Sequence, residues 1–403
     1  MIMEENRKGV LDGITVLDFS QVLAGPYGTM WLADLGATVI KVENPKKGDV
    51  TRSYPPIKME GMCAYFTSLN RSKKGITLNL KADEGKKIVY ELAKQADIVV
   101  QNFRPGVMKK LGIGYEDLKK VNPRIIYANI SGYGSNGPDA FLPGYDVVSQ
   151  GAGGIMEMTG YAEGPPTRVG SSIGDTMGGV GMVIGVLAAL NHREQCGEGM
   201  EIDISLTDMV TALCTREYIR YFGGGEIPTR MGNNYKLWAP YGLYKAKDGW
   251  YTVACGTEKH FMKFGKELMK LDSVTYEKYS THEKRTADRE GIDALVNAWA
   301  KDKTVDEITA LFAAEGIPGG PVMDITKLVN DPQVAGERNM FPMQTQEGLG
   351  TMPVTNTPIR FSRSVVRAPE PAPMLGQDNE EILSDMLGMS AEEIAALKAD
   401  GVI

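Results

Sequence analysis

Histidine and cysteine are scarce in this chain, which has three histidines and four cysteines among 403 residues. The histidines, His192, His260 and His282, form no His-Glu-x-x-His or similar paired spacing, so we expect no metal site. The cysteines are scattered without a Cys-x-x-Cys motif, which argues against a disulfide framework. They predict reduced thiols in a cytoplasmic protein.

Positive charge and long apolar runs are also limited. The 44 Lys and Arg residues against 51 Asp and Glu residues give a formal net charge of −7, which argues against a nucleic-acid-binding protein. The longest apolar run, from Met177 to Leu190, is shorter than the stretch of about 20 residues that spans a bilayer. The N-terminal residues contain no apolar core of a signal peptide. We therefore expect neither a membrane nor a nucleic acid among the partners.

The first half of the chain alternates predicted strands and helices. The segment ITVLDFS, from Ile14 to Ser20, predicts a strand, AGPYGTMWLADLG a helix, and TVIKVE, from Thr38 to Glu43, a second strand. Such a βαβ unit makes its two strands parallel. Because DIVVQNF and RIIYANIS predict further strands, we expect an α/β fold with a doubly wound, Rossmann-like large domain.

The pattern changes after the glycine-rich stretch YFGGGEIP. The segment YGLYKAKDGWYTVACG predicts a hairpin that turns at Lys-Asp-Gly, and several helical segments follow it. We therefore predict a large domain over residues 1–210, a linker over 211–230 and a smaller α+β domain over 231–335. Residues 336–403 are expected to form a linker and helices that return to the large domain.

A dinucleotide site is one candidate function, because Glu43 ends the second strand of the βαβ unit. The loop SQVLAGPYG, however, lacks the Gly-x-Gly-x-x-Gly that lets the backbone approach a pyrophosphate. A plain α/β layer is therefore favoured over NAD binding.

The segment GSSIGDTMGG, from Gly170 to Gly179, contains a candidate serine nucleophile. Ser172 lies in a Gly-x-Ser-x-Gly motif, but such a serine follows a strand directly, and here the preceding YAEGPPTRV contains two prolines. A serine hydrolase also needs a histidine base, and His192 lies at the far end of the predicted helix. The serine motif is therefore interpreted as accidental.

Asp175 in the same segment has two interpretations. Asp is a preferred N-cap, and an apolar helix begins directly after it. Alternatively, Gly174, Gly178 and Gly179 keep side chains away, so that a substrate could approach the carboxylate. Backbone N–H groups at the helix start would then stabilise an oxyanion. A carboxylate in such a cleft suits acyl transfer through an anhydride.

A series of segments carries a family resemblance along nearly the whole chain. These segments are VLDFSQVLAGPYGTMWLADLGATVIKVENPKKGD, LNLK, QNFRPGVMKKLGIGYEDL, SGYGSNGP, PGYDVVSQGAGG, IGDTMGG, APYGLYKAKDG, GIPGGPV with NDPQV, and APMLGQDNEEIL. With them the chain resembles the class III CoA-transferases, which include formyl-CoA:oxalate, carnitine and bile-acid CoA-transferases. The α-methylacyl-CoA racemases form a branch of this family.

The resemblance implies an enzyme that moves CoA from an acyl-CoA donor to a carboxylic acid acceptor. Asp175 is the implied nucleophile, which carries an acyl anhydride and then a CoA thioester. Coenzyme A and acyl-CoA are then substrates, and no tightly bound cofactor, metal or ATP is expected. The implied assembly is an interlocked homodimer of ring-like chains, each with a Rossmann-like large domain, a small domain and long linkers.

Further residues take implied roles by their match to the family's motifs. The implied CoA contacts are Gln21, Val22, Ala24, Leu78, Lys81, Asn102, Phe103, Arg104 and Lys110. The implied substrate site is bordered by Leu23, Tyr65, Tyr145 and Asp146. Additional phosphate contacts are considered for Arg71, Lys73 and Lys74.

Three departures from the family's patterns bear on function. The racemase branch carries a His base where this chain has Tyr145, and Tyr is a poor base for removing an α-proton. A transferase is therefore favoured, with an α-methylacyl-CoA racemase or epimerase as the alternative. Oxalate-specific members carry Gln at the position of Leu23, which argues against oxalate. Lys110 replaces the usual Arg and loses bidentate phosphate geometry.

Overall fold

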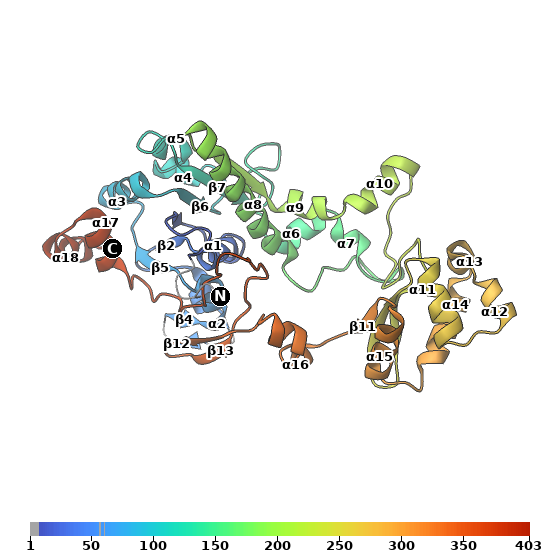
Figure 1. Cartoon of the computed structure of the whole chain (residues 1–403). Coiled ribbons are helices and arrows are strands. Elements are labelled where there is room, and N and C mark those ends of the chain that lie inside the picture. The colour runs from blue at the N-terminus through green and yellow to red at the C-terminus, as the bar shows by residue number, and fades with distance from the viewer. Residues whose placement is uncertain (1–7, 56–57, 60) are drawn as a thin grey trace. The chain divides into compact units, whose positions relative to one another are not determined.

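The computed structural model describes residues 8–55, 58–59 and 61–403, which divide into two compact units (Figure 1). The large unit contains the described residues up to Ile155 together with Arg168–Glu217 and Pro332–Ile403. The small unit contains Met156–Thr167 and Tyr218–Asp331. The domain boundaries predicted from the sequence, after residues 210, 230 and 335, stay predictions.

The helices and strands of the large unit come from both ends of the chain. They are β1 (Thr15–Asp18), α1 (Ala24–Asp34), β2 (Thr38–Glu43), η2 (Val50–Ser53), β3 (Lys58–Met59), β4 (Met62–Cys63), α2 (Ala64–Asn70), β5 (Lys74–Thr77), α3 (Asp83–Gln95), β6 (Ile98–Gln101), α4 (Val107–Leu111), α5 (Tyr115–Leu118), β7 (Ile126–Ser131), α6 (Asp146–Ala152), α8 (Ile173–Cys196), β8 (Glu201–Ser205), α9 (Leu206–Leu213), η4 (Pro332–Glu337), β12 (Met343–Gln346), β13 (Gly350–Pro353), α17 (Asn379–Leu387) and α18 (Ala391–Ala399). The chain passes between the units within α7 (Ile155–Met158), after Thr167, within α10 (Thr215–Gly224) and after Asp331.

A six-stranded sheet with the order β5-β2-β1-β6-β7-β8 forms the centre of the large unit. Val16 of β1 lies opposite Val39 of β2 and Ile98 of β6, and all neighbouring strands of this sheet run parallel. When these six strands alone are numbered along the chain, their order is 3-2-1-4-5-6, which is that of doubly wound nucleotide-binding folds. The predicted α/β fold with a parallel sheet is therefore confirmed.

Helices cover both faces of the sheet, which explains why its strands are apolar on both sides. On one face, Leu32 of α1 and Val186 of α8 belong to the same buried cluster as Val16 of β1. On the other face, Leu92 of α3 and Leu383 of α17 belong to a second buried cluster.

The helices α1 and α8 pack with their backbones in contact. A Cβ atom added at Gly179 would lie 2.6 Å from the carbonyl oxygen of Ala24, and one added at Gly28 would lie 2.8 Å from the carbonyl oxygen of Gly179. A Cβ atom added at Gly178 would lie 2.3 Å from Cδ2 of Leu206. The idea that Gly178 and Gly179 leave room for a substrate is therefore wrong, because both glycines permit close packing within the fold.

The helix α8 is longer than the apolar run from Met177 to Leu190, which predicts a buried helix. It spans 24 residues, because polar residues continue the helix beyond that run. Ile184 is 62% exposed, so the helix is not buried on all sides. In the described part of the chain, α8 alone has the length and apolar composition of a membrane span, but here it packs on α1 and β7 within the large unit.

The C-terminal segment closes one edge of the parallel sheet. The Asp378 carboxylate accepts a hydrogen bond of 2.6 Å from the Gly75 backbone N–H of edge strand β5, although 303 residues separate the two. Asn379 accepts a hydrogen bond from the Thr77 N–H and donates one to the Thr77 hydroxyl. The exposed N–H groups of β5 are therefore satisfied by side chains from the far end of the sequence.

The small unit contains an antiparallel sheet with the order β11-β10-β9. Tyr251 of β10 lies opposite Tyr244 of β9, and the Ala246 N–H donates to the Gly249 carbonyl across the turn, which confirms the predicted hairpin. The elements of this unit are β9 (Tyr241–Lys245), β10 (Trp250–Ala254), α11 (Glu258–Met262), η3 (Lys263–Leu268), α12 (Ser273–Lys278), α13 (His282–Ala287), α14 (Arg289–Ala300), α15 (Val305–Glu315), β11 (Gly319–Pro321) and α16 (Ile325–Leu328).

We expect Gly179→Ala to lower the free energy of unfolding by about 1–3 kcal/mol, because the added methyl group would overlap the backbone of α1. Gly170→Ala is the matched control, since nothing lies within 4 Å of its added Cβ atom. The control should change the free energy of unfolding by less than about 0.5 kcal/mol. Urea unfolding followed by circular dichroism measures both variants, and equal stabilities would contradict the packing role of Gly179.

Candidate active site

A cavity of about 210 Å³ opens at the carboxyl ends of β1, β6 and β7. It lies where the strand order reverses between β1 and β6, which is where doubly wound sheets bind ligands. The cavity brings together predicted site residues that are far apart in the sequence: Gln21, Val22, Leu23, Ala24, Asn102, Phe103, Arg104, Tyr145 and Asp175.

Asp175 lies in the first turn of α8 and lines this cavity. Asp146, at the start of α6, accepts hydrogen bonds from the backbone N–H of Gly174 at 2.8 Å and from that of Asp175 at 3.4 Å. The N-cap position belongs to Ser172, whose side chain makes no capping hydrogen bond. The interpretation of Asp175 as an N-cap is therefore wrong, because Asp146 from another helix supplies the capping carboxylate.

The same contacts change the expected source of oxyanion stabilisation. The N–H groups of Gly174 and Asp175 already donate to Asp146, so they are not unpaired donors aimed at a substrate. Gln150 in turn donates to the second Asp146 oxygen at 2.8 Å and fixes its orientation. An oxyanion in this cavity therefore needs a donor other than the first turn of α8.

Asp175 has a strongly altered acidity. Burial, followed by the negative charge of Asp146, raises the pKa of Asp175 from 3.8 to about 7. The Tyr65 hydroxyl is close enough to be affected as well: burial and then the charge of Asp175 raise the pKa of Tyr65 to about 12. At neutral pH Asp175 thus gains and loses its proton, whereas the nearby Tyr65 phenol, outside the cavity lining, keeps its proton. A titratable group in a cavity whose pKa is shifted by burial and a specific charged neighbour is typical of catalytic sites.

The serine alternative lacks the required geometry. The residues directly before Ser172 form no strand, as the sequence predicted. Ser172 and His192 lie near opposite ends of α8, roughly 30 Å apart at about 1.5 Å per helical residue. A histidine that far away cannot act as the base for this serine, so the Gly-x-Ser-x-Gly match is accidental.

The loop from Gln21 to Ala24 forms one wall of the cavity and is held by Asn102. The side-chain oxygen of Asn102 accepts the Gln21 N–H at 2.8 Å, and its side-chain nitrogen donates to the Gln21 carbonyl at 2.7 Å. Asn102 therefore joins the loops that follow β1 and β6, in addition to lining the cavity.

Other predicted contacts lie elsewhere in the large unit. Leu78 is 1% exposed within the core and does not line the cavity. Lys81 and Lys110 are exposed outside the cavity lining, whereas Arg104 is exposed and lines it. The structure thus does not bring Lys81 and Lys110 to the cavity wall.

Four charged residues that the sequence offered for ligand binding form ion pairs with other residues of the chain. Glu43 accepts hydrogen bonds from Arg52 at 2.9 and 2.6 Å, so its carboxylate is not available to a ribose. The cations considered for phosphate contacts also have internal partners: Arg71 pairs with Asp34, Lys73 with Asp18 and Lys74 with Glu381. The expectation of phosphate contacts is therefore wrong for Arg71 and Lys73, whose pairs are buried, and stays a prediction for Lys74, which is partly exposed.

The sequence did not identify Lys41, Asp49 and Gln150 as residues that hold the site together. Lys41 and Asp49 form an ion pair of 3.0 Å in which both side chains are fully buried. The one signal in the sequence was Lys41 itself, a cation inside the apolar strand TVIKVE. A charge at a buried strand position requires a partner, but the sequence does not say which residue supplies it.

The small unit contains a cluster with potential metal ligands. Ligand atoms of Glu258, His282 and Glu283 lie within 4.8 Å of one another. Glu258, however, is already paired with the buried Arg285 guanidinium at 2.9 Å, and the two ring nitrogens of His282 lie 3.2 and 2.8 Å from oxygens of Glu258 and Glu283. The expected lack of a metal site stays a prediction.

Comparison with known proteins gives consistent matches over nearly the whole chain. The sequence model of CoA-transferase family III matches residues 11–379. The chain is 37% identical over 387 residues to a succinyl-CoA:mesaconate CoA-transferase of Haloarcula marismortui, covering 94% of this chain and 96% of the relative. It is 39% identical over 336 residues to an acetyl-CoA:oxalate CoA-transferase of Acetobacter aceti, covering 83% of this chain and 86% of the relative.

A solved structure matches equally well. The crystal structure of a CAIB/BAIF family protein from Brucella suis superimposes with a TM-score of 0.84 at 35% sequence identity. The match covers 94% of this chain and 100% of that protein.

The altered pKa of Asp175 should make the free energy of unfolding depend on pH. Because its pKa is about 7 in the folded chain and 3.8 without these surroundings, the folded state binds the proton more tightly, and stability falls as the pH rises from about 4 to 7. Asp175→Asn removes this loss, so the variant should exceed the wild type at pH 8 by at most about 4 kcal/mol. Thermal unfolding at pH 4.5, 6 and 8 measures the difference, and a difference that does not change with pH would contradict the assignment.

Proposed function

The chain belongs to CoA-transferase family III and is a CoA-transferase, and we propose that it moves CoA between two carboxylic acids through covalent intermediates on Asp175. The observation that carries the proposal is the position of the Asp175 carboxylate in the cavity at the strand-order reversal, next to a second carboxylate. A carboxylate with a pKa near 7 is a stronger nucleophile when ionised than an ordinary one, because nucleophilicity rises with basicity.

The first half-reaction transfers CoA to the enzyme. An oxygen of ionised Asp175 attacks the thioester carbonyl of the donor, the carbon–sulfur bond breaks, and CoA leaves as a thiolate from an aspartyl acyl anhydride. The thiolate then attacks the aspartyl carbonyl. This step forms an aspartyl-CoA thioester and releases the donor acid as a carboxylate.

The second half-reaction reverses these steps with the acceptor. The acceptor carboxylate attacks the aspartyl thioester, which forms a second anhydride and again releases the thiolate. Attack of the thiolate on the acceptor's carbonyl gives the new acyl-CoA and returns Asp175 as a carboxylate. The acyl bonds on both sides of each exchange are similar in energy, so the sequence needs no ATP and no tightly bound cofactor.

The surrounding residues have distinct proposed roles. Tyr65 keeps its proton at neutral pH and is the proposed donor to the oxyanion that forms in each attack. Asp146 holds the first turn of α8 and keeps the pKa of Asp175 high. The loop from Gln21 to Ala24, with Asn102 and Phe103, is proposed to hold the pantetheine arm, because these residues line the same cavity.

We propose short dicarboxylic acids as the substrate class, with succinyl-CoA as the first donor to test. The relatives described above are named for succinyl-CoA and mesaconate and for oxalate, and another relative, 33% identical, is named a succinate–glutarate CoA-transferase. Leu23 lines the cavity without a polar group, which favours acids longer than oxalate. The racemase alternative is not favoured, since these relatives are named as transferases.

A homodimer is the proposed assembly of the enzyme, and the cytoplasm is its proposed location. In the single chain, Ile184 of α8 is 62% exposed and Leu213 of α9 is 42% exposed, which leaves apolar surface on neighbouring helices of the large unit. A second copy would cover such surface. A stable folded monomer in sedimentation at nanomolar concentration would contradict the interlocked arrangement.

The covalent intermediate gives a direct test. After incubation with succinyl-CoA and digestion, mass spectrometry should find CoA attached to the peptide that contains Asp175. Asp175→Ala should lose the adduct and lower kcat by about 10³-fold or more, because the nucleophile is absent. Asp385→Ala, an exposed Asp on α17, is the control and should keep both. A fully active Asp175→Ala variant would disprove the proposal.

The pH dependence of kcat/KM should report ionisation of Asp175. We expect a rise with pH whose midpoint is near 7, since the ionised form attacks. Asp146→Asn removes the second negative charge but keeps an acceptor for the Gly174 N–H, so the midpoint should move to lower pH. Initial rates between pH 5 and 9 test this, and an unchanged midpoint would exclude Asp146 as a cause of the raised pKa.

A further inference from the structure

Val22 has an unusual backbone conformation at the edge of the cavity. Its φ is +68°, in the left-handed region, which a β-branched residue rarely adopts. Such a conformation costs about 1–3 kcal/mol and persists only where the surroundings enforce it. The neighbouring residues Leu23 and Ala24 line the cavity with Val22, so this backbone conformation determines the path of the chain along the cavity wall.

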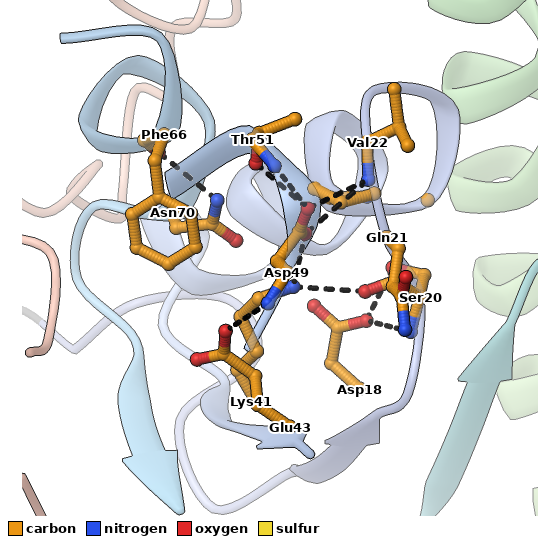
Figure 2. A network of polar contacts seen from close by, with 12 residues as sticks. Asp18, Ser20, Gln21, Val22, Lys41, Glu43, Asp49, Thr51, Phe66 and Asn70 are labelled. Atoms are coloured by element: carbon orange, nitrogen blue, oxygen red, sulfur yellow. Dashed lines mark hydrogen bonds and ion pairs between the residues drawn. The ribbon is translucent and has the colours of Figure 1, made fainter. Parts of the chain in front are cut away.

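Asp49 supplies the contact that enforces this conformation. The Val22 backbone N–H donates to both oxygens of the Asp49 carboxylate, at 3.3 and 3.4 Å (Figure 2). The carboxylate also accepts hydrogen bonds from the Thr51 N–H at 3.0 Å and the Thr51 hydroxyl at 2.8 Å. The Asp49 N–H donates to Glu43 at 2.7 Å, which fixes the backbone of Asp49 itself.

Lys41 connects the same carboxylate to the start of the loop. Its ammonium group donates to Asp49 Oδ2 at 3.0 Å and to the Ser20 carbonyl at 2.8 Å. Figure 2 shows Lys41 and Asp49 beside the segment from Ser20 to Val22, with dashed lines joining their polar groups to it. The ion pair therefore holds the loop at two backbone groups, one on each side of Gln21.

We propose that Lys41 and Asp49 are positioning residues that shape the loop from Gln21 to Ala24 for binding the CoA moiety. The proposal rests on the function proposed above. Neither side chain lines the cavity, so both act through the backbone that they hold. Asn102 holds the Gln21 backbone from the loop that follows β6, so the three side chains together fix backbone groups of Ser20, Gln21 and Val22.

The charge of Asp49 is maintained at neutral pH. Burial alone would raise the pKa of Asp49, but the Lys41 ammonium and the Thr51 donors outweigh burial and lower it. Each Asp49 oxygen therefore remains an acceptor. An Asn at this position would offer one acceptor oxygen in place of two, and the Lys41, Thr51 and Val22 donors would compete for it.

Asp49→Asn tests the proposal with a matched control. Hydrogen exchange of the Val22 amide should become roughly tenfold faster, and the KM for the acyl-CoA should rise roughly tenfold, as expected for loss of one hydrogen bond to a charged group. Asp34→Asn is the control, since Asp34 forms an equally buried ion pair with Arg71 that does not contact the loop. The control should lower the thermal midpoint but leave Val22 exchange and KM unchanged.

A second variant separates positioning from stability. In the double variant Lys41→Met with Asp49→Asn, no unpaired buried charge remains, so the thermal midpoint should recover toward the wild-type value. Val22 exchange and the KM should stay as high as in Asp49→Asn. Recovery of the KM together with the thermal midpoint would overturn the proposal, as would an Asp34→Asn variant with the same rise in KM.

Failure of the proposed function would give a different result. If the wild type transfers no CoA, the positioning role can still be tested. Hydrogen exchange then measures the Val22 amide, and calorimetry measures the affinity for free CoA. Faster Val22 exchange with unchanged CoA binding would overturn the positioning role and leave the covalent chemistry of Asp175 untouched. A missing aspartyl-CoA adduct in the wild type would instead refute the proposed function.

Discussion

The backbone contact between α1 and α8 is the constraint on which the site depends. Gly28 and Gly179 let the two helices approach until backbone meets backbone, and each helix begins at the cavity. The start of α1 carries the loop from Gln21, and the first turn of α8 carries Asp175. Because packed helices move as rigid bodies, the nucleophile and the opposite wall keep a fixed separation.

The electrostatics of the site trade stability for reactivity. Asp175 lies in a poorly solvated position beside a second carboxylate, and both features disfavour its charge. Asp146 nevertheless satisfies the helix start and so cannot be removed without loss elsewhere. Such local destabilisation is typical of active sites, and the rest of the fold must supply the stability that the site loses. Here the buried pairs around Lys41 and Lys73, and the two covered faces of the sheet, make up that surrounding fold.

The sequence predicted the periodic features of the molecule better than its particular contacts. The βαβ unit, the parallel sheet and the hairpin at Lys-Asp-Gly follow from local patterns of apolar and turn residues, and all three are present. Nine residues that the family motifs offered for the site line one cavity, and their roles stay predictions. The capping partner of α8 was missed because Asp146 is 28 residues from Gly174, and no local pattern joins them. The glycines were misread because close helix packing and substrate access both require small residues.

The charged residues show the same limit. The partners of Lys41, Arg71 and Lys73 come from other strands and helices, and pairing between distant charges leaves no periodic signal. The backbone strain at Val22 could not be predicted either. A positive φ usually falls on a glycine, but in SQVLAG the glycine is Gly25, three residues after the strained Val22.

The closure of β5 by Asp378 has a consequence for synthesis of the protein on the ribosome. Gly75 leaves the ribosome 303 residues before its partner does. At about 5–20 residues per second, the edge of the sheet stays open for roughly 15–60 s while the rest of the chain is made. Throughout that time the nascent chain offers unpaired strand N–H groups to its neighbours, so its greatest risk of aggregation comes before release.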